Sequence, residues 1–253
     1  MKNHSLKNVS RRQFIQHSAA VTGTFIVGMH LPIVSEAATA GASASPALAN
    51  AWIQITSSNQ ITLICARSEM GQDVYTSLPA LLAEELNLPL SMVKVEIAGV
   101  APVYINAMLG GQITGGSTSV REAFDKLRTA GAATRSVLVQ AAAQRWNVAA
   151  SDCKALNGKV THAGGKSATY GELAADAAKL PLPEKPVLKS PANFMVIGKE
   201  TMRRLDTPAK IAGKAVYGID VKIPGMAIAS LAQCPVIGGT PKSYDASGAL
   251  KVA

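Results

Sequence analysis

The sequence predicts an α+β fold in which helices lie on one face of a small mixed sheet. Three short runs rich in β-branched residues alternate with two segments whose apolar residues recur at helical spacing, so the predicted order is β-β-α-β-α. Of the 253 residues, 48% are hydrophobic and 16% are charged. This composition supplies enough apolar side chains for a core, and the length allows one large domain or two small ones.

The first 40 residues are expected to be an export signal. A basic stretch ends at Arg11 and Arg12, and a 16-residue apolar segment at 19–34 and several small residues follow it. The arginine pair before Phe14 resembles the twin-arginine type of signal, although Gln16 stands where that type usually has lysine. The apolar segment is shorter than the roughly 20 residues that span a bilayer. An uncleaved membrane anchor remains the alternative.

Residues 51–97 contain the first predicted elements. The runs 52–55 and 61–65 flank a polar turn and indicate a hairpin. A helix is expected from residue 74 to residue 86, where Asn87 and Pro89 end it, and the alternating pattern of 92–97 predicts a third strand.

A glycine-rich loop then leads into a long helix, expected from Ser117 to Trp146, in which Gly131 marks a kink or a close contact. A short hairpin is expected over 155–162, around Asn157-Gly158. A second short helix is expected over 169–178, with Thr169 as its N-cap.

The last third of the chain is expected to leave this domain. Four prolines between residues 180 and 191 predict an extended connector, and the runs 215–221 and 226–231 predict two strands of a new domain. The expected organisation is therefore a signal at 1–40, a linker at 41–50, an α+β domain at 51–179, a connector at 180–200 and the start of another domain at 201–253.

Charge, cysteine and histidine patterns exclude several function classes. The net charge is +9, but four basic residues and one acidic residue lie in the first 40, and the remaining charges form no dense basic run that would bind nucleic acid. The three cysteines are far apart, so they predict neither a disulfide framework nor a metal site, and no histidine pair has metal-ligand spacing.

The first candidate site is Glu69-Met70-Gly71-Gln72, between a strand and a helix. Gly71 allows a left-handed backbone or a close ligand, and Gln72 offers an amide that both donates and accepts hydrogen bonds. The first-turn amides of the following helix are expected to favour an anionic group there. The alternative is an ordinary glycine turn.

The second candidate site is the segment 114–119, Thr-Gly-Gly-Ser-Thr-Ser, which opens the long helix. Its bare amides and hydroxyls at a helix N-terminus form an anion cradle suited to phosphate. It lacks the Gly-Lys-Ser/Thr ending of a Walker loop. The alternative is a plain N-cap by Ser117 or Thr118. Elsewhere, Glu84 and Glu85 are expected to be solvated or partnered acids.

Four segments together resemble the molybdopterin-binding large subunit of the xanthine dehydrogenase family, in its isoquinoline 1-oxidoreductase beta-subunit and aldehyde dehydrogenase branch. They are the segment 69–72 with Tyr75-Thr76, Ala-Glu-Glu-Leu at 83–86, Thr-Gly-Gly-Ser-Thr-Ser-Val-Arg at 114–121, and the stretch 204–220. The last stretch resembles the opening of that family's α/β-hammerhead domain, which would start at 201–253 and be incomplete.

The resemblance implies cofactor contacts at eight positions. Those expected to contact the pterin cofactor are Met70, Gly71 and Gln72. Those expected to hold the pterin and the phosphates of its nucleotide tail are Gly115, Gly116, Ser117, Thr118 and Ser119. Asp73 departs from the glycine that the family usually has, and an acid beside a polyanionic cofactor is unfavourable unless it points away.

The resemblance also implies an activity and a set of partners. The expected activity is molybdenum-dependent hydroxylation of an N-heterocycle or aldehyde with water as oxygen source. The expected cofactor is molybdenum-molybdopterin in its cytosine dinucleotide form. Electrons would pass to a small subunit with two [2Fe–2S] clusters and on to a membrane acceptor such as a cytochrome, after export to the periplasm.

The family chain is several times longer than this one, so the sequence is expected to be an amino-terminal fragment. It lacks the family's catalytic carboxylate, so no catalytic residue or metal ligand is assigned to it, and the chain alone is expected to be inactive. The alternative hypothesis is a truncated, non-catalytic fold or interaction module without cofactor.

Overall fold

A computed structural model describes residues 25–26, 51–199 and 202–251. The predicted linker at 41–50 and the predicted signal lie outside these residues, except for Phe25 and Ile26, which form strand β1. No helix in the described ranges is both long enough and apolar enough to cross a membrane.

The first sheet has the order β1-β2-β3-β4 and is mixed, as predicted. β2 (Ile53–Ile55) and β3 (Ile61–Cys65) form the expected antiparallel hairpin, and β4 (Val93–Ile97) pairs with β3 in parallel. All five residues of β3 are buried, because it is a central strand that packs against a helix.

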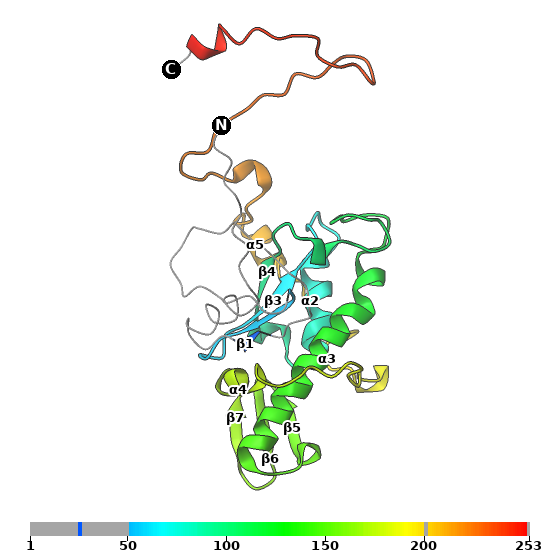
Figure 1. Cartoon of the computed structure of the whole chain (residues 1–253), viewed down its shortest axis with the longest axis vertical. Coiled ribbons are helices and arrows are strands. Elements are labelled where there is room, and N and C mark those ends of the chain that lie inside the picture. The colour runs from blue at the N-terminus through cyan, green and yellow to red at the C-terminus, as the bar shows by residue number, and fades with distance from the viewer. Residues whose placement is uncertain (1–24, 27–50, 200–201, 252–253) are drawn as a thin grey trace.

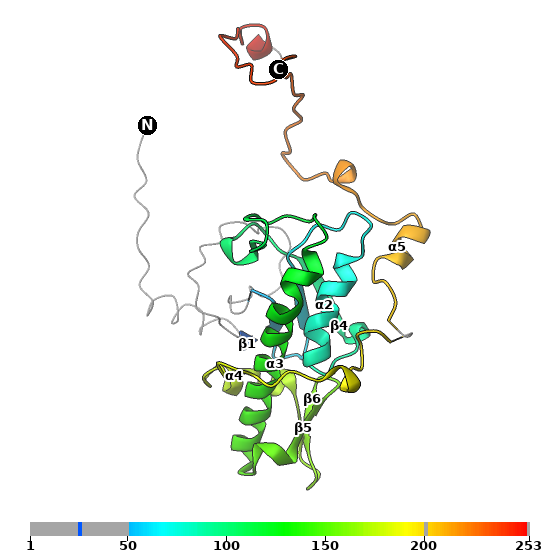
Figure 2. The same ribbon diagram turned by 90° about the vertical axis from the view of Figure 1, so that its right-hand side faces the viewer.

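Two helices run side by side next to this sheet (Figures 1 and 2). α2 (Val74–Glu85) connects β3 to β4 and packs on β3, and α3 (Ser119–Trp146) packs along α2. Both bounds agree with the sequence prediction to within two residues. A Cβ on Gly131 of α3 would lie 2.8 Å from the carbonyl oxygen of Leu82, so this glycine marks a close helix contact.

A second sheet, of order β5-β6-β7, packs against the other end of α3 (Figure 2). Its strands are β5 (Cys153–Leu156), β6 (Lys159–His162) and β7 (Ser167–Thr169). Asn157 and Gly158 both have positive φ, 48° and 74°, as a tight hairpin turn requires. The sequence predicted this hairpin but missed β7 and the separate sheet.

Helix α4 (Tyr170–Ala177) begins at a complete capping box. The Thr169 hydroxyl accepts from the Glu172 amide, and the Glu172 carboxylate accepts from the Thr169 amide at 2.6 Å. The predicted N-cap is therefore confirmed. The remaining helical segments are short: η1 (Leu90–Met92), η2 (Pro102–Tyr104), η3 (Ala150–Asp152), η4 (Pro191–Asn193), α5 (Thr207–Ile211), η5 (Gly218–Asp220) and η6 (Ala249–Lys251).

Two adjacent carboxylates at the end of α2 are fully buried and bound. Glu84 accepts the backbone amides of residues 195, 196 and 197 at 2.7–3.0 Å and pairs with the Lys189 ammonium. Glu85 accepts two hydrogen bonds from Arg128 at 2.8 and 2.9 Å, and Arg135 lies 3.4 Å from it. Of the two alternatives for these acids, solvated or partnered, the structure shows the second.

This pair of glutamates also fixes the proline-rich connector. Backbone carbonyls of the connector accept from α3, since Arg128 donates to Lys189 and Arg135 donates to Val187. The connector is extended and contains no helix or strand before η4, as predicted, but it is bound along α2 and α3.

The two strands predicted at 215–221 and 226–231 are wrong. In the structure the first run contains only η5, and the second has no regular structure. Ile219 is 93% exposed and Ile228 is 92% exposed. An isolated two-stranded unit is marginal, and the described residues offer these runs no sheet to join, so β propensity alone does not produce strands. A hammerhead domain here stays a prediction.

Burial and hydrogen bonding of Glu84 predict an acid-sensitive fold. Burial raises the pKa of this carboxyl, but Lys189 and three backbone amides lower it more, so the pKa lies below its ordinary value of 4.5. The stabilisation is therefore present above about pH 4.5 and is lost as the pH falls through the lowered pKa. We expect the free energy of unfolding to drop on acidification in that window.

Glu84→Gln tests this assignment. It should lower the free energy of unfolding at pH 7 by about 3 kcal/mol, because it removes the carboxylate partner of the partly buried Lys189 ammonium and of three backbone amides. It should also flatten the dependence on pH below 4.5, as measured by denaturant unfolding. Glu184→Gln, at an exposed position of the connector, is the matched control and should behave like the wild type. Equal pH profiles for all three chains would contradict the prediction.

Candidate functional site

The two loops singled out in the sequence meet at one end of α2 and α3. They share an acceptor, the Ser68 carbonyl oxygen. The Gln72 side-chain amide donates to it at 3.0 Å, and the Thr114 hydroxyl, from the second loop, also donates to it at 3.0 Å. Segments 46 residues apart are thereby held side by side at the N-terminal ends of both helices.

In the first loop the anion at the start of α2 is Glu69. Its carboxylate accepts the backbone amides of Gly71, Asp73 and Tyr75 at 2.6, 3.0 and 2.9 Å. Burial raises the pKa of Glu69, but these amides outweigh it, so the pKa lies below its ordinary value. An anionic group does lie at the start of α2, as expected, but it is a carboxylate of the same chain, and the first-turn amide that it binds is that of Tyr75.

The tip of this loop is exposed. Met70 is 71% exposed, and Gly71 has φ 105°, with no heavy atom within 4 Å of the position a Cβ would take. The side chain of Gln72 closes the loop on itself, since it also accepts from the Met70 amide at 2.7 Å. Surface available to a ligand is therefore provided mainly by Met70 and Gly71.

The second loop leads into α3 through two left-handed residues, Gly116 at φ 59° and Ser117 at φ 51°. Thr118 is the N-cap residue, but its side chain makes no capping hydrogen bond. Its buried hydroxyl instead donates to the Gly115 carbonyl at 2.9 Å and accepts from Asn106 at 2.7 Å. The side-chain N-cap predicted as the alternative is absent at this residue.

Two hydroxyls of this loop remain available. Ser117 is exposed and Ser119 is 9% exposed, and within the part of the chain that the structure describes neither side chain forms a hydrogen bond. The N-cap residue of α3, Thr118, provides no side-chain cap. Uncapped helix amides beside hydroxyl and glycine are the donors that bind phosphate. Gly115 and Gly116 add no side chain to the loop, and the side chains of Ile113 and Leu109 lie 3.8 and 3.9 Å from where Cβ atoms at these glycines would be.

Two buried groups that the sequence did not indicate hold the second loop. Asn106 is fully buried and bonds Thr118 and the Met108 amide, so it shapes the turn before the loop. Arg67 is also buried, and it donates to Glu122 in the first turn of α3 at 2.9 Å and to the Tyr104 carbonyl at 2.7 Å. Asn106 is followed by Ala-Met-Leu-Gly-Gly, a local pattern that could have indicated the turn. No local pattern could have indicated the ion pair of Arg67 with Glu122, because the two residues are 55 apart.

Charged groups of a third segment lie beside the first loop. Arg204 donates to the Gly71 carbonyl at 3.1 Å and lies 3.4 Å from Asp73 and 3.7 Å from Glu69. Asp206 in turn binds Arg204 and Lys210, which lower its pKa to about 2. Asp73 has φ 75°, and one of its oxygens is buried without a hydrogen bond.

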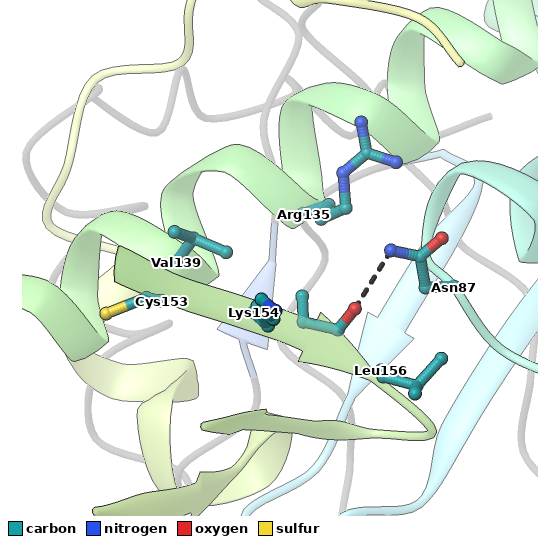
Figure 3. A pocket seen from close by; sticks show the side chains of 7 residues that line it. Asn87, Arg135, Val139, Cys153, Lys154 and Leu156 are labelled. Atoms are coloured by element: carbon teal, nitrogen blue, oxygen red, sulfur yellow. Dashed lines mark hydrogen bonds between the residues drawn. The ribbon is translucent and has the colours of Figure 1, made fainter. Parts of the chain in front are cut away.

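A shallow hollow of about 420 Å³ lies away from both loops (Figure 3). Asn87, Arg135 and β5 line it, and Asn87 donates to the Ala155 carbonyl across it at 2.9 Å. Arg135 is bound to Glu85 and Val187, so the hollow offers no convergent set of unused polar groups. Across the described ranges, no cluster of three or more His, Cys, Asp or Glu side chains could hold a metal ion.

Comparison with known proteins gives one family and several relatives. The family model of the molybdopterin cofactor-binding domain matches residues 7–223. The chain is 32% identical to the isoquinoline 1-oxidoreductase subunit beta of Brevundimonas diminuta, over 96% of this chain and 36% of that protein. It is also 32% identical to the membrane-bound aldehyde dehydrogenase (pyrroloquinoline-quinone) of Gluconacetobacter polyoxogenes, over 79% of this chain and 26% of that protein.

The chain thus spans 36% or less of the length of these relatives. Among solved structures, the reconstituted CO dehydrogenase from Oligotropha carboxidovorans aligns with 48% of this chain and 15% of its own, at 23% identity and a TM-score of 0.39.

The shared acceptor at Ser68 predicts that Thr114 couples the two loops. Thr114→Val keeps the shape of the side chain but removes the donor, and we expect it to lower the free energy of unfolding by about 1 kcal/mol. It should also speed amide hydrogen exchange in residues 68–72. Thr114→Ser keeps the hydroxyl and is the control. If the valine and serine variants exchange at the same rate in this loop, the hydrogen bond does not couple the loops.

Proposed function

Because the chain belongs to the molybdopterin cofactor-binding domain family, we propose that it forms one wall of the cofactor site in the large subunit of a molybdenum hydroxylase. The observation that carries the proposal is the meeting of the two loops at the open N-terminal end of α3. The N-cap residue of that helix provides no side-chain cap, and the hydroxyls of Ser117 and Ser119 form no hydrogen bond among the described residues.

The residues present fit a phosphate-bearing pterin. Gly115, Gly116, Ser117 and Ser119 offer neutral N–H and O–H donors, which suit phosphate oxygens at a helix N-terminus. On the facing loop, Gly71 leaves open space and Met70 offers an apolar side chain to a flat ring. Thr118 and Gln72 stabilise the two loops, because the polar groups of their side chains are already hydrogen-bonded to the loop backbone.

When bound, the molybdenum cofactor supplies oxidation of a substrate carbon. This chain's own residues bind and orient the cofactor, and none of them is assigned a proton transfer. The proposed substrate is an N-heterocycle or an aldehyde. The support for this choice is the names of the two relatives. Water as oxygen source and the cytosine dinucleotide form of the cofactor belong to the same proposal.

The proposed partner is a small subunit with two [2Fe–2S] clusters. Its support is the name of one relative, which designates it the beta subunit of its enzyme. A cytochrome is proposed as the next acceptor, and association with a membrane is part of this proposal. The chain alone is proposed to be inactive, since it spans 36% of that relative.

A second candidate function is a fold or interaction module that binds no cofactor. The observation that favours it is that the first loop satisfies its own hydrogen bonds, since Glu69 accepts the Tyr75 amide of α2 and the Gln72 side chain bonds the backbone of Met70 and Ser68. The two functions differ in whether the purified chain carries pterin.

We propose export to the periplasm by the twin-arginine route, on the basis of Arg11 and Arg12. Changing both to lysine keeps the charge but removes the pair that this route requires, so the chain should stay in the cytoplasm. Cell fractionation with immunoblotting measures this, with Lys2→Arg and Lys7→Arg as the matched control. Normal periplasmic arrival of the double-lysine variant would rule out the route.

Removal of the two free hydroxyls tests cofactor binding. Each hydrogen bond to a charged group contributes about 1.5–3 kcal/mol, so Ser117→Ala with Ser119→Ala should lower retention of pterin and molybdenum at least about tenfold. The chain is purified from a host that makes molybdopterin, and released pterin and metal are measured per chain alongside thermal melts. Ser151→Ala, on the exposed turn before β5, is the control. Unchanged pterin in the double variant would contradict the binding role of these hydroxyls, and no pterin in the wild type would favour the module.

A further inference from the structure

We propose that Arg204 is a positioning residue of this site: it is the counter-ion that lets two carboxylates of the first loop lie beside a bound anion. The inference rests on the proposed function and deepens it, because it brings into the site a segment outside both loops. Its basis is the contact of one guanidinium with three groups of the loop 69–73, namely Glu69, the Gly71 carbonyl and Asp73.

The charges of this loop need such a counter-ion. Glu69 and Asp73 place two negative charges within five residues of the chain, at a loop that would face phosphate. Like charges brought together raise the energy of both, unless a cation lies between or beside them. Among the described residues, Arg204 is the cation within 4 Å of both carboxylates.

Asp73 depends on Arg204 most directly. Its buried Oδ1 atom has no hydrogen bond, and the Arg204 Nε atom, 3.4 Å away, is the positive group facing it. Asp73 also has a left-handed backbone at the N-cap of α2, which fixes where its carboxylate points. Without the guanidinium, this partly buried acid would keep an uncompensated charge next to the anion site.

Arg204 is held in position by its own segment. Asp206 binds it with two hydrogen bonds of 3.1 and 3.0 Å, and Lys210 binds Asp206 from the other side. The Leu205 amide donates to the Thr76 hydroxyl of α2 at 3.0 Å. Because that contact does not involve the guanidinium, a change at position 204 should leave the segment attached and alter only the loop.

The test uses the whole chain and four variants. Arg204→Gln removes the charge and the fork of donors, whereas Arg204→Lys keeps the charge alone. Arg204→Gln with Asp73→Asn also removes the carboxylate that lost its partner, and asparagine tolerates a left-handed backbone. Arg145→Gln is the control, because Arg145 is similarly exposed, at 38% against 35%, and pairs with Asp176 at the far end of α3.

Two readouts separate positioning from a general loss of stability. Amide hydrogen exchange in the chain without cofactor reports the order of residues 70–73, with core amides of α3 as the internal reference. Pterin per purified chain reports the site. We expect Arg204→Gln to speed exchange at 70–73 and to lower pterin about tenfold, since a hydrogen bond to a charged group is lost, with core exchange unchanged.

The conservative and double variants decide whether charge compensation is the cause. Arg204→Lys should keep most of the pterin, and Asp73→Asn should restore pterin to the Arg204→Gln chain at least severalfold. Wild-type exchange and wild-type pterin in Arg204→Gln would overturn the inference, as would failure of Asp73→Asn to restore pterin. Absence of pterin from the wild type would instead overturn the proposed function, and loop exchange alone would then decide whether Arg204 positions the loop.

Discussion

The burial of two adjacent carboxylates, Glu84 and Glu85, is the constraint on which the arrangement of this chain depends. A buried carboxylate is costly unless charges and hydrogen bonds replace the water it loses. Here that replacement comes from two parts of the chain: the side chains of α3, and the connector through its backbone amides and the Lys189 ammonium. Because neighbouring residues of a helix point in different directions, one carboxylate is bound mainly by α3 and the other by the connector. The relative position of α2, α3 and the connector is thereby fixed.

The burial of Glu84 and Glu85 also affects the candidate site, because the two helices that these residues hold together begin at its loops. α2 begins at the first loop and α3 at the second, so fixing the helices against each other also fixes the distance between the loops. The two loops then differ in electrostatic character. At α2 a carboxylate of the chain occupies the helix amides, whereas at α3 the first turn has no side-chain cap. The helix dipole therefore favours an external anion more at the start of α3 than at the start of α2, where the chain already supplies a carboxylate.

The sequence predicted most of the elements but less of the site, and the difference has a physical cause. The hairpins, the two main helices and the Thr169 cap depend on neighbours within a few residues, and such signals can be read locally. The strands at 215–231 were wrong because a strand needs a paired neighbour. The sequence identified both candidate loops, and the structure brings them together. It gave no sign that Arg67 reaches Glu122, because this ion pair depends on the folded chain bringing together residues that are 55 apart. The contact of Glu69 with the Tyr75 amide is local, and the sequence indicated only that an anion is favoured there.

The close approach of α3 to α2 at Gly131 has a consequence for how the sequence can change over evolutionary time. A side chain there would meet a backbone carbonyl of α2 and the Cβ of Glu85 at 2.8 and 2.9 Å, and backbone cannot move aside as a flexible side chain can. Any larger residue therefore pushes α3 outward and lengthens the ion pairs that Arg128 and Arg135 make with Glu85. A substitution at this glycine is therefore expected to affect the charged groups of Glu85, Arg128 and Arg135 as well as the local packing of the two helices.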